Sequence, residues 1–271
     1  MERLRHYYYF DERNDDFAND GIKGSPTPAD YEYFPKNILY RTLKPIVYYV
    51  YMGLVALLVK PLSRLKRVHN VGVLRKVENR RKGYFVFGNH TNVFADALLH
   101  PVVAFPRSVY IVANPDAISI PGLKTFLRML GTVPVPYAKS TYVKYMNAIK
   151  RMYDHGHPIV VYPEAHIWPK YNAVRDFPDV SFKLPVRLGA PCFAKSTVYH
   201  KDSRGHTYAE VWYDGPFYPD ATLPEKKAQK ELRDRIYAKI CERCKDSELD
   251  CRYTYEKVDD PQEVRTEIEI V

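Results

Sequence analysis

Cysteine is scarce in this chain, with four among 271 residues. So few cysteines exclude a secreted fold held together by disulfides. Cys241 and Cys244 form a C-x-x-C pair with Cys251 nearby, but no fourth ligand stands at zinc spacing, so we interpret them as reduced thiols. The first residues also lack the apolar core of a signal peptide, which predicts a cytosolic setting.

Long hydrophobic runs are almost as rare, and residues 45–59 form the one that stands out. Fifteen helical residues rise about 22 Å, whereas a hydrocarbon core is about 30 Å thick. Extending the run back to Ile38 recovers the length but includes Arg41 and Lys44. A strongly basic stretch follows up to residue 82, and an apolar helix with a basic flank is typical of a two-signal membrane anchor. A spanning helix and an ordinary core helix are the alternatives.

What the chain does have is apolar content and positive charge. Hydrophobic residues make up 46% of the chain, enough for a sizeable core, and 41 Lys and Arg against 32 Asp and Glu leave a net charge of +9. This excess favours anionic partners such as lipid headgroups, acidic carriers or nucleic acid. The basic residues cluster behind the apolar helix without interleaved stacking aromatics, which disfavours nucleic acid.

From residue 84 onward, short apolar segments alternate with helical patterns, which predicts an α/β fold with a mixed, largely parallel sheet flanked by helices. We expect strands at 84–87, 109–113, 159–162, 191–194 and 209–213, and helices near 93–104, 121–130, 140–155 and 224–246. The predicted organisation is a polar arm (1–36), a membrane-associated helical segment (37–67), an α/β domain (68–255) and an acidic, loosely held tail (256–271).

The first of these strands ends in the most informative motif, residues 88–96, which contain His90 and Asp96. Open α/β sheets place ligands at the carboxyl ends of their strands. A carboxylate nearby can orient an imidazole, so the pair could act as a base and its orienter. A structural, hydrogen-bonded histidine is the alternative.

A second strand ends in Tyr162-Pro163-Glu164-Ala165-His166. If the two strands are neighbours, Glu164 and His166 lie at the same sheet edge as His90. Glu164 could then position an acceptor hydroxyl, or it could be a solvated loop carboxylate.

Together these segments resemble the glycerolipid acyltransferases, the lysophospholipid acyltransferase family, over residues 68–199. That family's four motifs are similar to Asn89-His90 with Asp96, to residues 131–137, to residues 162–167 and to residues 188–193. The resemblance implies acyl transfer from acyl-coenzyme A or acyl carrier protein to a lipid hydroxyl, without metal or other cofactor. It implies His90 as general base, Asp96 as its orienter, and substrate contacts from Asn89, Gly131, Tyr137, Glu164 and His166.

The motifs also depart from the family pattern. Five residues rather than four separate His90 from Asp96, so the pair requires a loop with one extra residue. Tyr137 and the segment 165–167 replace basic residues that would grip an acceptor phosphate. Lys139, Lys170 or Arg175 could substitute for them, or the acceptor is not lysophosphatidic acid.

We therefore expect an acyltransferase bound to the cytoplasmic side of the cytoplasmic membrane, as a peripheral or monotopic protein. Its partners would be a lipid acceptor, the thioester donor and the membrane surface, but not nucleic acid. The alternative is a catalytically inactive, membrane-associated lipid-binding protein of the same fold.

Overall fold

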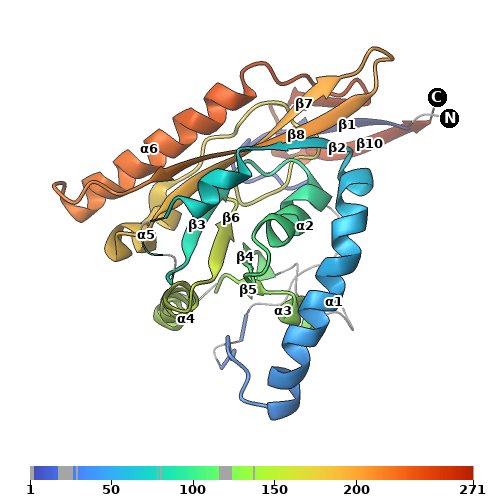
Figure 1. Ribbon diagram of the computed structural model, residues 1–271. Helices are drawn as coiled ribbons and strands as arrows, with labels where there is room; N and C mark the ends of the chain where they lie inside the picture. Colours follow the sequence, from blue (N-terminus) through green and yellow to red (C-terminus); the bar gives the residue numbers. More distant parts are fainter. Residues whose placement is uncertain are drawn as a thin grey trace.

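The computed structural model describes residues 3–17, 27–28, 30–77, 79, 81–115, 124–136 and 138–270. Its centre is a seven-stranded sheet with the order β2-β8-β7-β3-β6-β4-β5 (Figure 1). In that order the strands are Leu65–His69, Thr207–Phe217, Cys192–Lys201, Tyr84–Gly88, Pro158–Val161, Tyr110–Ala113 and Thr132–Pro134. The strands from β7 to β5 are parallel to one another, whereas β8 pairs antiparallel with β7. The predicted α/β class and its mixed, largely parallel sheet are confirmed.

Six α-helices are present in the described residues. They are α1 (Ile38–Ser63), α2 (Val93–Val103), α3 (Lys124–Met129), α4 (Tyr142–Asp154), α5 (Lys183–Leu188) and α6 (Glu225–Cys244). Single 3₁₀ turns are η1 (Val71–Arg75), η3 (Lys139–Thr141), η4 (Asp179–Phe182) and η5 (Pro261–Glu263). The five expected strands and four expected helices all occur within a few residues of their predicted limits, except that β7 and β8 run several residues further.

The strand β3 shows how the sheet separates two cores. Its side chains alternate, so Tyr84 and Val86 pack with α1 and α2, while Phe85 and Phe87 pack with α4 and α6. The helix α6 contributes Leu232, which repeats at helical spacing with two isoleucines one and two turns later. Helices therefore cover both faces of the sheet, and β3 lies in the middle of the molecule.

The two ends of the chain form a second sheet, whereas the sequence predicted a polar arm at one end and a loosely held tail at the other. Its order is β10-β1-β9, from Arg265–Ile270, Arg3–Tyr9 and Tyr253–Lys257. Tyr7 is buried there with Phe17 and Trp168. The aromatic residues of the ends thus pack onto the loop that follows β6.

The helix α1 is 26 residues long, longer than the apolar run itself. By length and composition alone it could cross a membrane. One face packs on the domain through Tyr48, Met52, Val55 and Val59. The opposite face exposes a stripe of apolar side chains: Ile38, Leu39, Leu43, Ile46, Val50, Leu54, Leu57, Leu58 and Leu62. Figure 1 shows the helix lying along one side of the domain next to α2.

Candidate active site

The loop after β3 is held by Asn89. Its amide donates to the Thr197 carbonyl oxygen at 2.9 Å and accepts from the Thr197 N–H at 2.8 Å. These two bonds pair the loop with β7 beyond the end of the β3 ladder. Because the Asn89 side chain is buried, its position favours a role in supporting the loop rather than in contacting substrate.

His90 and Asp96 lie together despite their five-residue spacing. The helix α2 begins directly after Asn92, whose side chain accepts a hydrogen bond from Ala95 N as an N-cap. Asp96, in the first turn, places Oδ2 2.9 Å from His90 Nδ1 and 3.0 Å from Asn92 N. Since a carboxylate only accepts, Nδ1 donates and Nε2 keeps the lone pair that can take a proton. The His90 side chain is 22% exposed, so a ligand can reach it.

Sequence reasoning missed Lys195. Its Nζ lies 2.6 Å from Asp96 Oδ1 and 3.1 Å from the Tyr162 hydroxyl, and its side chain is fully buried. Burial favours the neutral acid, but Lys195 and the bond to His90 outweigh it and hold the pKa of Asp96 below its usual value. A lysine inside a buried apolar strand was the available signal, because such a charge needs a partner.

The two strand ends do meet at one edge, as expected, because β6 pairs directly with β3. Tyr162 stacks on the His90 ring with centroids 4.5 Å apart. Glu164 accepts from the His90 backbone N–H at 3.2 Å through Oε2, and its side chain is buried. Burial raises the pKa of Glu164, opposed by Arg175. Glu164 thus holds the main chain of His90 in place through this hydrogen bond. Its contact with an acceptor hydroxyl stays a prediction.

Arg175 points inward rather than toward an open site. Nη2 donates to Glu164 Oε2 at 3.0 Å and to the His166 carbonyl, and the guanidinium lies 4.8 Å from the Trp168 ring centroid. At 1% exposure its side chain could not grip a surface phosphate without rearrangement. His166 is half-buried, with Nδ1 3.1 Å from Asp16 Oδ2. Ala165, where the family pattern has glycine, adopts φ 65°.

The backbone conformation at Gly131 requires glycine. It adopts φ 95°, and a Cβ there would lie 2.1 Å from the Val109 carbonyl oxygen. Tyr137 and the side chain of Lys139 lie outside the described residues. Lys170 is described: its N–H donates to Thr91 O at 2.8 Å, and its ammonium lies 4.8 Å from the Tyr199 ring centroid. Burial lowers the pKa of Lys170 to about 8.

Apolar side chains lie exposed beside the histidine loop. Val93 and Phe94, in the first turn of α2, are both about half exposed. The loop itself bonds to the end of α1, since Asn92 Nδ2 donates to Ser63 O at 3.1 Å. The candidate base is therefore linked to the helix that carries the exposed apolar stripe.

The fold and the site define a three-layer α/β domain with an Asp-oriented histidine at the carboxyl end of its central strand, an arrangement suited to general-base chemistry. Residues 67–196 match the family model described as Acyltransferase, which confirms the resemblance predicted for residues 68–199. No curated protein was found to match the chain. Among solved structures it is similar to the 1-acyl-sn-glycerophosphate (LPA) acyltransferase PlsC from Thermotoga maritima, at 16% identity and TM-score 0.47, covering 75% of this chain and 97% of that one.

Proposed function

We propose that the protein transfers a fatty acyl group from acyl-coenzyme A or acyl carrier protein to the hydroxyl of a lysophospholipid or similar amphipathic acceptor. The observation that carries this proposal is the 2.9 Å contact between His90 Nδ1 and Asp96, within the region that matches the acyltransferase family model. Partial exposure of the His90 ring supports access for an acceptor.

In the proposed reaction, the oxygen of the acceptor hydroxyl attacks the thioester carbonyl carbon, and Nε2 of His90 takes the hydroxyl proton. Asp96 keeps the imidazole oriented and stabilises the imidazolium. Collapse of the tetrahedral intermediate forms the ester and expels the thiolate, which recovers the proton from His90. Lys195 and Tyr162 hold Asp96 and the ring in place.

The location we propose is the cytoplasmic side of the cytoplasmic membrane, with α1 lying in the interface. The face of α1 that packs on the domain includes Tyr48, whose hydroxyl accepts from Val109 N at 2.9 Å. Lys44, one turn earlier, donates to the Tyr110 hydroxyl at 2.7 Å. A helix attached to the domain in this way presents only its outer stripe to lipid, which supports in-plane rather than spanning placement.

The test is a donor-release assay with acyl-coenzyme A against a panel of lysophospholipids and other amphipathic alcohols. We expect His90→Ala to lower turnover on the best acceptor by about 10²–10⁴-fold, as for loss of a general base. His155→Ala is the matched control, because the ring of this surface histidine bonds only the Arg151 carbonyl among the described residues. Full turnover by His90→Ala would disprove the base assignment. Lipid bound by the wild type without any transfer would instead favour the inactive lipid-binding alternative.

A further inference from the structure

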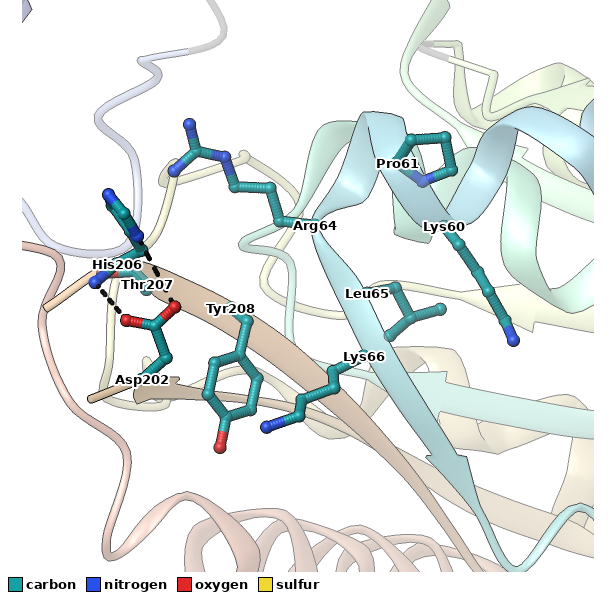
Figure 2. A pocket seen from close by; sticks show the side chains of 9 residues that line it. All are labelled: Lys60, Pro61, Arg64, Leu65, Lys66, Asp202, His206, Thr207 and Tyr208. Atoms are coloured by element: carbon teal, nitrogen blue, oxygen red, sulfur yellow. Dashed lines mark hydrogen bonds and ion pairs between the residues drawn. The ribbon is translucent and has the colours of Figure 1, made fainter. Parts of the chain in front are cut away.

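A basic pocket lies where α1 ends and β2 begins, away from the His90 loop (Figure 2). It is an open pocket with a volume of about 460 Å³. Its lining comes from the last turn of α1, the start of β2 and the turn between β7 and β8: Lys60, Pro61, Arg64, Leu65, Lys66, Asp202, His206, Thr207 and Tyr208. The proposed acyl-transfer step uses none of these residues.

The charge in this pocket is predominantly positive. Three basic residues, Lys60, Arg64 and Lys66, line the pocket, and Asp202 is the one carboxylate in its lining. Asp202 is already engaged: Oδ1 accepts the backbone N–H groups of Arg204 and His206 at 2.8 and 2.9 Å, and Oδ2 lies 3.5 Å from His206 Nδ1. Its charge is therefore largely satisfied within its own turn, which leaves the cations of the pocket available to a ligand.

The cations are attached to ordered backbone. Arg64 ends α1 in the left-handed conformation, with φ 51°, and its N–H bonds the Lys60 and Pro61 carbonyls. Its own carbonyl accepts from Ala209 N at 2.9 Å, which ties the helix end to β8. Lys66 Nζ lies 4.2 Å from the Tyr208 ring centroid. Figure 2 shows Arg64 and Lys66 on the side of the pocket that faces Tyr208, Asp202 and His206.

The pocket opens at the same sheet edge as His90. The start of β2, the start of β8 and the end of β7 lie at the edge where β3 also ends, because β8 is antiparallel to β7. Three strand spacings separate β2 from β3, on the order of 15 Å. Lys170, whose backbone N–H bonds the Thr91 carbonyl, lies beside the histidine loop, and its ammonium is influenced by Asp250 and, less strongly, by Arg64. Basic side chains therefore occur both beside the histidine loop and in the pocket.

We propose that this pocket binds a phosphate group. Guanidinium and ammonium groups are the side chains that bind phosphate most strongly. The exposed apolar stripe of α1 ends at Leu62, which follows the lining residue Pro61 in the chain. Two sources share this chemistry: the phosphates of a thioester donor, whose reactive end could extend toward His90, and the headgroup of an anionic lipid lying along α1. The assignment of the phosphate to a thioester donor rests on the proposed function, whereas the proposal that the pocket binds phosphate does not.

The test measures binding without catalysis. The double variant Arg64→Gly and Lys66→Gln removes two cations, and glycine suits the left-handed backbone at position 64. The control, Lys36→Gln with Arg41→Gln, removes the same charge from exposed residues at the other end of α1. One arm titrates unacylated coenzyme A. The other uses flotation with phosphatidylcholine vesicles with and without phosphatidic acid.

We expect the pocket variant to bind at least about tenfold more weakly than the control in one of the arms. Selective loss of coenzyme A binding identifies the donor phosphates as the ligand, and selective loss of binding to phosphatidic acid vesicles identifies a lipid headgroup. Equal affinity of wild type, variant and control in both arms overturns the proposal, as does an equal loss in variant and control. Because no transfer is measured, an inactive enzyme that still binds phosphate would contradict only the proposed function.

Discussion

Asp96 is the residue on which the candidate site depends, because it is a buried carboxylate shared between two basic groups. Oδ1 contacts Lys195 at 2.6 Å and Oδ2 contacts His90 at 2.9 Å. Only His90 reaches solvent, and its ring rests on Tyr162. The Asp96 carboxylate thus orients the imidazole of His90, while Lys195 compensates the buried charge of Asp96. The two contacts use different oxygens, so the stabilisation of Asp96 by Lys195 can be tested separately from the effect of Asp96 on His90.

That separation can be tested with Lys195→Met. The substitution leaves Asp96 buried with less compensating charge, so we expect the free energy of unfolding to fall by about 3–5 kcal/mol. Adding Asp96→Asn removes the uncompensated charge and should restore most of that stability. Acyl transfer should nevertheless stay at least about a hundredfold below wild type in the double variant, because asparagine cannot stabilise an imidazolium. Denaturant unfolding and donor release measure the two effects, and a double variant no more stable than Lys195→Met would contradict the assignment.

At the scale of elements, the small sheet of the chain ends supports the active-site loop. Tyr255 on β9 stacks on Trp168 with centroids 5.3 Å apart and on Tyr7 at 4.9 Å. The backbone N–H of Trp168 donates to the backbone carbonyl of His90 at 3.0 Å. Residues near the two termini are therefore joined to the histidine by one stack of rings and one backbone hydrogen bond.

We expect Tyr255→Ala to lower the free energy of unfolding by about 3–5 kcal/mol, since it empties the centre of this stack. It should also lower the rate of acyl transfer under conditions where the domain is folded, because the loop that carries His90 loses its support. Tyr253→Ala is the control: it lies on the same strand, is half-buried like Tyr255 and stacks on Tyr7 at the longer distance of 6.3 Å, whereas Tyr255 is the one that stacks on Trp168. Thermal unfolding and single-temperature kinetics measure both. Equal effects of the two substitutions would show that the stack on Trp168 does not support the loop.

Five of the seven strands of the central sheet were predictable because they are short apolar segments separated by helices, whereas β2 and the three-residue β5 lack that pattern. His90 and Asp96 were predictable because they lie in one loop and the first turn of the helix that follows it. The small sheet was not, since β1 and β10 are short segments rich in charged residues that pair across nearly the whole chain, with Arg3 opposite Ile270. Lys195 was missed for a related reason. Its approach to Asp96 depends on the register that places it opposite Gly88, and no local pattern in the sequence encodes a pairing between strands so far apart in the chain.

At the scale of the whole molecule, exposed apolar surface gathers on the side that carries α1. The outer stripe of α1 joins Phe105, which packs against Tyr49 with ring centroids 6.1 Å apart, and Val93 and Phe94 beside the histidine loop. Scattered surface leucines are ordinary, but a stripe along 26 residues next to a candidate site is typical of a membrane-binding face. This distribution favours a domain that rests on the bilayer with His90 near the level of the headgroups.

Leu54→Glu with Leu58→Glu tests that orientation, because both side chains lie on the outer stripe and are more than half exposed. Each leucine that enters an apolar phase contributes about 1.5–3 kcal/mol, so we expect the double variant to partition onto vesicles at least about a hundredfold more weakly. Its stability and its turnover on a monomerically dispersed acceptor should match wild type, since neither residue is among the buried side chains that pack on α2. Val180→Glu, at an exposed apolar position on η4 beside the opposite core, is the control and should leave partitioning unchanged. Unaltered flotation of the double variant would mean that the bilayer contacts some other face, and the in-plane placement of α1 would then be wrong.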